Sequence, residues 1–227
     1  MLGADEAGKG PVLGPMVAAA VRADPGAIPE GADDSKRLSP ARRDDLDAAL
    51  RADDRVAVGV SVVGVGRIDD PATDMNTLTV AGQAEALAAV AHDGDRAVVD
   101  AGDVSESRFA ERVADAVAGA DVEPAEGTDI AVDVTAEHGA DGSYPVVAAA
   151  SVIAKVERDR IVAELDAAYR VRGYDGIGSG YPSDPATREF LREYVDCEGD
   201  LPDCARRSWS TCDDLLAASE QSALGEF

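Results

Sequence analysis

Two adjacent carboxylates near the start of the chain, Asp5 and Glu6, are followed at once by the glycine-rich turn Gly8-Lys9-Gly10. Carboxylate oxygens are ligands for hard divalent cations. Glycine-rich turns let backbone N–H groups approach a phosphate or a sugar closely. Because the carboxylates follow a short apolar run, these residues together predict metal-assisted chemistry on a phosphate ester.

Two further aspartates stand where metal ligands can be expected. Asp100 ends the apolar run 97–99, and strands of α/β sheets place their ligand sites at their carboxyl ends. Asp159 falls on the apolar stripe of a long segment with helical periodicity. A buried carboxylate needs a partner, which would be either a neighbouring arginine, Arg158 or Arg160, or a metal ion.

Carboxylates that converge on one point repel one another and raise each other's pKa values. Two divalent cations would remove that repulsion, activate a water molecule and stabilise the leaving oxygen of a phosphodiester. Neither of the two histidines, His92 and His138, falls within these motifs, and no Ser/His or Cys/His pair is evident. Metal-assisted hydrolysis is therefore favoured over covalent catalysis. Cys197, Cys204 and Cys212 form no Cys-x-x-Cys pair, so we expect reduced thiols and no zinc site.

The surrounding elements must bring these groups together. Alternation in a strand sends neighbouring side chains to opposite faces, so Asp5 and Glu6 can share a metal only where the strand ends and turns. The patterns predict a mixed α/β sheet with helices packed on it. Residues 172–184 should form a loop, and the chain should fray from about residue 218. Predicted strands cover 2–5, 12–21, 55–65, 97–100 and 129–136, and predicted helices cover 40–52, 75–92, 105–117, 144–169, 184–196 and 203–220.

The composition fits one sizeable globular domain of 227 residues. We expect a cytoplasmic protein, because the sequence shows neither a long apolar run nor a signal-peptide pattern. The net charge of −24 would argue against a polyanionic partner if it stood alone. However, acid excess with only three lysines resembles adaptation to molar salt, where the Debye length falls to about 3 Å. We therefore interpret the acidic surface as a solvation feature of an extreme halophile.

Six motifs together resemble those of the type 2 ribonucleases H (RNase HII), in the archaeal style. The resemblance extends from residue 1 to about residue 212 with the motifs in order. Lys9 is a departure, because many members of the family carry arginine there, and lysine cannot form a bidentate fork. The matching segments are Asp5–Pro15, Asp34–Leu38, Val98–Val104, Ala148–Asp159, Gly178–Pro182 and Arg207–Trp209.

The resemblance implies an RNase H-like α/β fold, with a mixed central sheet flanked by helices and a C-terminal helical extension. It implies a site of Asp5, Glu6, Asp100 and Asp159 that holds Mg²⁺ or Mn²⁺, with two ions during catalysis. The implied substrates are RNA/DNA hybrids and duplex DNA that contains ribonucleotides. Cleavage on the 5′ side of the ribonucleotide would leave 3′-hydroxyl and 5′-phosphate ends.

Substrate recognition is expected from the turn and from a loop tyrosine. Gly8, Lys9 and Gly10 are suited to bind the 2′-hydroxyl, which distinguishes RNA from DNA. The resemblance implies that Tyr181 packs on the sugar of the next deoxynucleotide. Lys36 could neutralise phosphate charge, with a solvated surface role as the alternative. In so acidic a chain, the nucleic-acid-binding face is expected to depend on Arg158, Arg160, Arg206 and Arg207.

We expect a monomer with a catalytic domain over 1–171, an extension over 172–220 and a tail over 221–227. In the tail, Gln221, Leu224 and Phe227 have a spacing similar to that of sliding-clamp-binding peptides. An aliphatic and an aromatic anchor three residues apart can fill one hydrophobic pocket from a single helical turn. The alternative to a nuclease is a nucleic-acid or sliding-clamp adaptor that retains the fold with weak or no catalysis.

Overall fold

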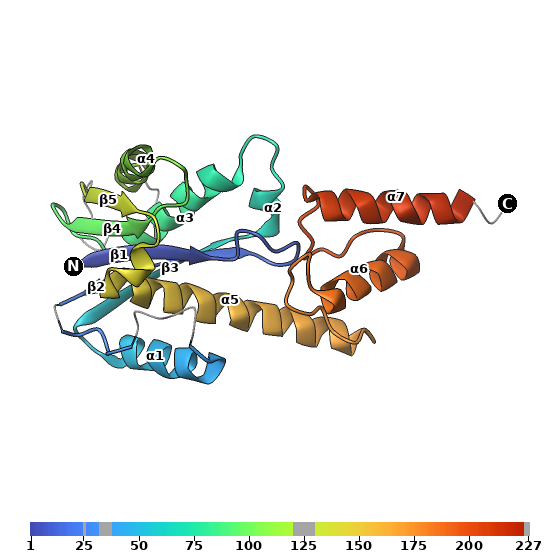
Figure 1. Ribbon diagram of the computed structural model, residues 1–227, viewed down its shortest axis with the longest axis horizontal. Coiled ribbons are helices and arrows are strands. Elements are labelled where there is room, and N and C mark those ends of the chain that lie inside the picture. The colour runs from blue at the N-terminus through green and yellow to red at the C-terminus, as the bar shows by residue number, and fades with distance from the viewer. Residues whose placement is uncertain (25, 32–37, 120–129, 225–227) are drawn as a thin grey trace. The chain divides into compact units, whose positions relative to one another are not determined.

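The computed structural model describes residues 1–24, 26–31, 38–119 and 130–224 (Figure 1). Contacts between residues divide the chain into two compact units. The first contains residues 1–7, 16–63 and 74–158, and the second contains residues 8–15, 64–73 and the chain from residue 159 onward. Since the boundary falls at Arg158 inside a helix, the units differ from the predicted division at residue 171, which stays a proposal.

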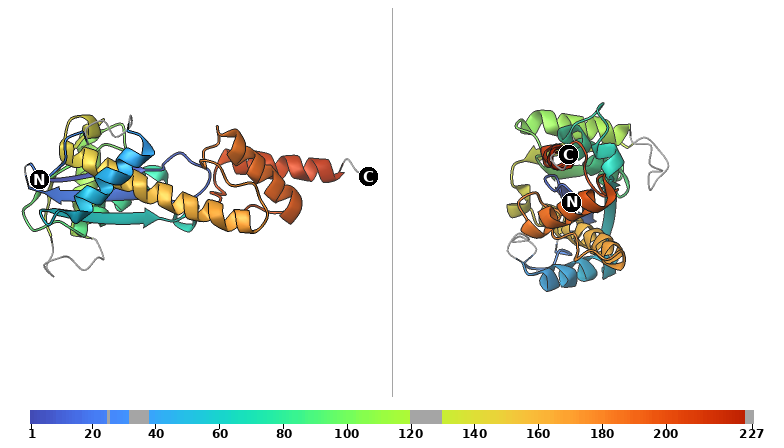
Figure 2. Two further views of the ribbon diagram at one scale, coloured as in Figure 1. Left: turned by 90° about the horizontal axis from the view of Figure 1, so that it is seen from below. Right: turned by 90° about the vertical axis from the view of Figure 1, so that its right-hand side faces the viewer.

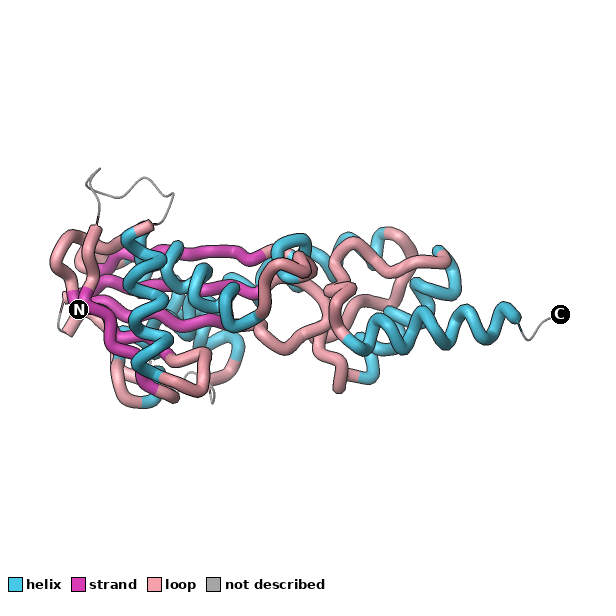
Figure 3. The backbone as a smooth tube through the Cα atoms, turned by 90° about the horizontal axis from the view of Figure 1, so that it is seen from above, coloured by secondary structure: helices cyan, strands magenta, loops and turns pink. Residues whose placement is uncertain are grey.

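One five-stranded mixed sheet forms the centre of the first unit (Figure 3). The strands are ordered β3-β2-β1-β4-β5. β1 pairs antiparallel with β2 and parallel with β4, β2 pairs antiparallel with β3, and β4 pairs parallel with β5. The predicted mixed sheet is therefore confirmed. The strands are β1 (Leu2–Ala7), β2 (Met16–Ala23), β3 (Val56–Val63), β4 (Arg96–Asp100) and β5 (Asp133–Glu137).

Helices α3 (Met75–Ala88) and α4 (Glu106–Ala118) cover one face of this sheet (Figure 1). Their apolar side chains form the main core with the sheet, in which Leu87, Val99 and Phe109 are almost completely buried. Each helix begins at a polar cap that satisfies a backbone N–H of its first turn. Ser105 caps α4 as the sequence predicted, by accepting a hydrogen bond from the N–H of Arg108.

The opposite face carries α1 (Pro40–Ala52) and residues 145–158 of α5 (Pro145–Val171) (Figure 1). α5 lies close to β1 because Gly3 has no side chain. A Cβ at Gly3 would lie 2.8 Å from Cγ1 of Val146 and 2.8 Å from the backbone nitrogen of Val147. The short helix η2 (Ala140–Gly142) precedes α5 in this unit.

The second unit contains α2 (Val65–Ile68), residues 159–171 of α5, α6 (Pro185–Glu198) and α7 (Ser210–Leu224). α6 and α7 can be followed in the left view of Figure 2. Four rings pack edge to face or tilted in the core of this unit, and the guanidinium of Arg172 lies over three of them, 5.1–5.9 Å from their centroids. The rings belong to Tyr169, Tyr174, Phe190 and Tyr194.

Several predicted boundaries are wrong. Residues 203–209 are not helical, because Ala205 forms a β-bridge with Leu13 and its neighbours bond the turn that follows β1. The chain does not fray at residue 218, since α7 continues to Leu224. β2 begins at Met16 rather than at Val12, and β5 is displaced toward Glu137.

No helix in the described part of the chain combines the length and the apolar character that crossing a bilayer would require. The three cysteines form no disulfide; Cys204 and Cys212 are buried and Cys197 is exposed. Burial raises the pKa of the Cys204 thiol to about 11, which keeps it protonated at neutral pH.

Candidate active site

Three of the four predicted carboxylates come from two neighbouring parallel strands of the first unit. Ala4 on β1 pairs with Val99 on β4, so the next residues, Asp5 and Asp100, stand level on adjacent strands. Glu6 follows Asp5 on β1, which continues through Ala7, so the predicted end of this strand at residue 5 is wrong. The register between β1 and β4 therefore brings together residues that lie 95 positions apart in the sequence.

Asp5 is the most enclosed of these groups, with 5% of its surface exposed. Its carboxylate accepts a hydrogen bond from the N–H of Glu6 at 2.7 Å and another from the side chain of Ser151 on α5. Burial, followed by the charges of Glu6 and Asp100, nevertheless raises the pKa of Asp5 well above its usual value. Asp5 is thus close enough to Glu6 and to Asp100 to be repelled by both.

Glu6 points to the other face of the sheet, as strand alternation requires. There, Nε2 of Gln83 on α3 donates to a Glu6 carboxylate oxygen at 2.6 Å and to the backbone carbonyl of Asp100 at 3.1 Å. The side-chain oxygen of Gln83 is buried and has no hydrogen-bond partner among the described residues. Gln83 was not predicted from the sequence, although a lone amide within the mainly apolar segment 78–88 was a usable signal.

The donor set fits a hard divalent cation, because it consists of carboxylate oxygens at strand ends. Burial, followed by repulsion from Glu6 and Asp100, raises the pKa of Asp5, and a bound cation would offset both effects by stabilising the ionised carboxylate. Across residues 1–24, 26–31, 38–119 and 130–224, no three His, Cys, Asp or Glu side chains already form a closed cluster of metal-binding geometry. Asp5, Glu6 and Asp100 are therefore neighbours whose side chains need rearrangement to share one ion.

Asp100 and Asp103 differ in their surroundings. Oδ1 of Asp100 accepts a hydrogen bond from the N–H of Ala140 at 2.8 Å, which fixes the carboxylate at the end of β4. Asp103 forms an ion pair with Arg108 at 2.7 Å and lies 3.9 Å from Arg112. The Arg108 hydrogen bond lowers the pKa of Asp103. Asp103 is thus engaged in anchoring the start of α4.

Asp159 lies on α5 and is half-buried. It begins the last segment of the second unit, whereas Asp5, Glu6 and Asp100 belong to the first unit. Its membership in the metal site therefore stays a prediction. Ser151, which bonds Asp5, lies two helical turns earlier on the same helix.

The turn Gly8–Pro15 belongs to the second unit, where it lies beside Tyr181. Gly8 has a φ of +91°, a conformation that favours glycine. A Cβ at Gly10 would lie 3.7 Å from Cε1 of Tyr181, so the turn and the tyrosine are in contact range. The Tyr181 side chain is 42% exposed. The structure thus brings together two predicted substrate-recognition elements that are far apart in sequence.

The prediction of a basic face built from four arginines is wrong for two of them. Arg206 has no exposed surface and Arg158 has 4%, so neither lies on an accessible face of its unit. Arg160 is paired with Glu164. Arg207 is paired with Asp200 at 2.9 Å. The sequence pattern could not reveal this, because a buried and an exposed arginine have the same residue type.

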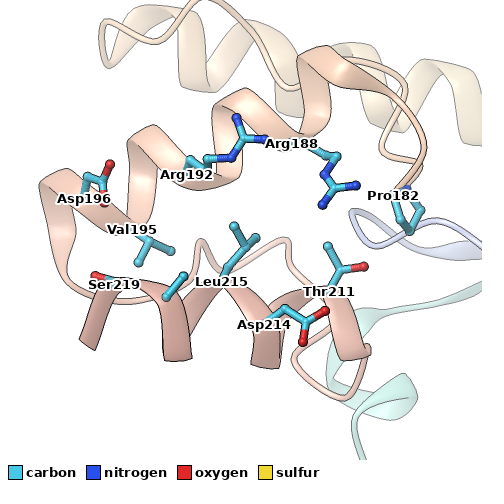
Figure 4. Close-up of a pocket in the computed structure, with 10 residues that line it drawn as sticks. Pro182, Arg188, Arg192, Val195, Asp196, Thr211, Asp214, Leu215 and Ser219 are labelled. Carbon is cyan, nitrogen blue, oxygen red and sulfur yellow. The ribbon is translucent and has the colours of Figure 1, made fainter. Parts of the chain in front are cut away.

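Lys36 lies outside the described residues, and so does Phe227 of the tail. Gln221 is exposed on α7, and Leu224 is the last residue of that helix. A groove between α6 and α7 is shown in Figure 4. It contains none of the predicted site residues, and both signs of charge line it, with Arg188 and Arg192 from α6 and Asp214 from α7.

Comparisons with known proteins agree on one family. The sequence model described as Ribonuclease HII matches residues 2–212. A protein named Ribonuclease HII from Haloarcula marismortui is 59% identical over 225 residues, which cover 99% of each chain. The crystal structure of ribonuclease H2 from Pyrococcus horikoshii is similar with a TM-score of 0.81 and 36% identity, over 97% of this chain and 100% of that one. The RNase HII of a PCNA:RNase HII complex from Archaeoglobus fulgidus gives a TM-score of 0.78 and 36% identity, over 94% and 95%.

Proposed function

The chain belongs to the ribonuclease HII family of endoribonucleases, which act on RNA/DNA hybrids, and we propose that it also incises duplex DNA on the 5′ side of embedded ribonucleotides. The products would carry 3′-hydroxyl and 5′-phosphate ends. The observation that carries this proposal is the β1–β4 register, which places Asp5 and Asp100 level on adjacent strands beside Glu6.

The family depends on a divalent metal ion, and we assign Mg²⁺ or Mn²⁺, two ions during catalysis, to Asp5, Glu6, Asp100 and Asp159. When bound, such ions activate a water molecule and stabilise the leaving oxygen of a phosphodiester. Ser151 and the Glu6 N–H orient the Asp5 carboxylate, while Gln83 orients that of Glu6. These hydrogen bonds support the Asp5 and Glu6 carboxylates in the metal-free protein, and the two side chains would rearrange to share an ion.

Ribonucleotide selection is assigned to the turn that follows β1 directly in sequence. Backbone groups of Gly8, Lys9 and Gly10 would bind the ribose 2′-hydroxyl, and Tyr181 would pack on the adjacent deoxyribose. The proximity of Gly10 to the Tyr181 ring supports this assignment, because one dinucleotide step could touch both. Lys36 is proposed to neutralise a backbone phosphate.

We further propose that the enzyme acts as a monomer that docks on a sliding clamp. The Archaeoglobus structure is a complex of RNase HII with PCNA. In this chain, α7 extends to Leu224, so Gln221 and Leu224 lie one helical turn apart. Together with Phe227, they would form the clamp-binding peptide.

The decisive experiment is an incision assay on duplex DNA with one ribonucleotide, in molar KCl with Mg²⁺ or Mn²⁺. We expect wild-type protein to cut 5′ of the ribonucleotide. Asp5→Asn and Asp159→Asn should each lower kcat at least about a hundredfold, because metal ions supply several kcal/mol of transition-state stabilisation. Asp133→Asn, which alters an exposed carboxylate on β5, is the matched control and should retain full activity.

Two outcomes would contradict the proposal. Incision that is undiminished in both site variants would remove the assigned carboxylates from the mechanism. An absence of incision by folded wild-type protein, on both the single-ribonucleotide duplex and a long hybrid, would favour the adaptor alternative.

A further inference from the structure

Arg206 is the largest completely buried side chain of the described residues, and its guanidinium contacts the backbone of the turn. It donates to the carbonyl oxygen of Gly8 at 2.6 Å, to that of Lys9 at 2.9 Å and to that of Gly14 at 2.9 Å. Burying a guanidinium is costly unless hydrogen bonds satisfy it. These three bonds therefore tie the charge to one conformation of the turn.

Trp209 completes the same cluster. The guanidinium of Arg206 lies 5.0 Å from the centroid of the indole, within cation–π distance. The indole N–H donates to the carbonyl oxygen of Gly10 at 3.3 Å. Three consecutive carbonyls of the turn, those of Gly8, Lys9 and Gly10, are thus bonded by two side chains.

The segment that carries this cluster is itself anchored. The backbone N–H of Arg206 donates to the carbonyl of Val12 at 2.8 Å. Asp69, the C-cap residue of α2, accepts hydrogen bonds from the backbone N–H groups of Arg207 and Ser208, both at 2.9 Å. The cluster therefore acts on the turn from a fixed position.

The orientation of the carbonyls determines where the N–H groups point. In a planar trans peptide, the C=O of one residue and the N–H of the next point in opposite directions. The described chain contains no cis peptide. Because the carbonyls of Gly8 and Lys9 point at Arg206, the N–H groups of Lys9 and Gly10 point away from it.

We infer that Arg206, assisted by Trp209, is a positioning residue that turns the Lys9 and Gly10 N–H groups toward the sugar of the substrate and so determines ribonucleotide selectivity. The inference rests on the proposed function of the turn. Arginine suits this role, because one planar guanidinium reaches three carbonyls at once and a lysine ammonium cannot match that fork geometry.

The test compares Arg206→Lys with wild type on duplexes that carry one ribonucleotide or one 2′-deoxy-2′-fluoro nucleotide at the same position. We expect kcat/KM for the ribonucleotide to fall by about a hundredfold, as expected when a reacting group is misplaced by about 1 Å. The ratio of kcat/KM for the ribonucleotide duplex to kcat/KM for the 2′-fluoro duplex should fall as well. Mn²⁺ affinity, measured by calorimetry, should be unchanged, because Asp5, Glu6 and Asp100 lie outside the turn. Arg192→Lys, an exposed arginine paired with Glu189, is the matched control.

Trp209→Phe is a second variant that keeps an aromatic ring beside Arg206 but removes the indole N–H. It should lower the same substrate ratio to a smaller extent, and it keeps the test available if Arg206→Lys does not fold. Trp209 is also the single tryptophan of the chain. Its fluorescence in an Asp5→Asn background should therefore change on binding the ribonucleotide duplex and not on binding an all-DNA duplex.

If folded Arg206→Lys and Trp209→Phe both keep the wild-type ratio of kcat/KM between the two substrates, the inference is overturned and the proposed function stays intact. An equal fluorescence response to the two duplexes would overturn it as well. Failure of the wild-type enzyme to cut either substrate would instead contradict the proposed function itself.

Discussion

At the scale of single residues, Asp5 and Glu6, two neighbouring carboxylates of the proposed site, point to opposite faces of β1. Asp5 bonds Ser151 of α5, and Glu6 bonds Gln83 of α3, so each face of the sheet supplies its own orienting side chain. Such support is typical of metal sites, where the residues behind the ligands fix their orientation. The site therefore depends on both helical layers.

Asp5 should reduce the stability of the metal-free protein. The pKa of Asp5 is raised in the folded state. Its carboxyl group therefore contributes to the free energy of unfolding below the pKa of the unfolded state, and this contribution is lost as pH rises through the folded-state pKa. We therefore expect Asp5→Asn to raise the melting temperature by a few degrees at pH 7 in EDTA and molar KCl, with the gain shrinking near pH 4. Thermal unfolding followed by circular dichroism measures this.

Added Mn²⁺ should reverse the order of stability. A ligand at a hundred times its Kd stabilises a folded protein by about 2.7 kcal/mol, and Asp5→Asn should lose much of that gain. Asp133→Asn should melt like wild type under both conditions. A metal-free Asp5→Asn protein that melts below wild type at pH 7 would contradict the assigned repulsion.

At the scale of elements, close approach of helices to the sheet depends on small residues. β3 contributes Gly59, and a Cβ there would overlap the backbone carbonyl oxygen of Ala86 on α3. Gly3 has the same role on β1 toward α5. Because α3 carries Gln83 and α5 carries Ser151, the positions of these helices also set the geometry of the acidic groups.

Gly59→Ala is expected to destabilise the protein by about 3 kcal/mol, because the overlap is with backbone and α3 must move. Urea unfolding in constant molar KCl measures the change. Gly66→Ala in α2 is the control, since nothing lies within 4 Å of its added Cβ and alanine favours a helix. Equal stability of Gly59→Ala and wild type would show that α3 does not pack as closely as described.

At the scale of the whole molecule, the net charge of −24 must be reconciled with a nucleic-acid substrate. The relative from Haloarcula marismortui is a halophile protein, which confirms the interpretation of the acidic composition. At about 1 M salt, repulsion between surface charge and a phosphate backbone extends only about 3 Å. Specific contacts can then outweigh the unfavourable net charge.

Clamp docking would link this molecule to replication and repair. Deleting residues 221–227 should abolish calorimetric binding to a halophile sliding clamp in molar KCl. Leu224→Ala and Phe227→Ala should each cost about 2 kcal/mol, as expected for apolar anchors at an interface. Ser222→Ala is the matched control and should bind normally. Full affinity of the truncated chain would remove the tail from this role.

Local sequence patterns were sufficient to predict the local features. Alternation sent Asp5 and Glu6 to opposite faces, Ser39 and Ser105 fixed two helix starts, and the motifs identified the family. Each of these follows from interactions within a few residues, which a local pattern can express.

Tertiary structure alone decided how distant segments meet. It set the β1–β4 register, recruited Gln83 to Glu6 and buried Arg206 against the turn 192–198 positions earlier in the chain. It also replaced the predicted start of the last helix with a β-bridge to Leu13. The physical reason is that burial and hydrogen-bond satisfaction depend on partners far away in sequence, which no local pattern records.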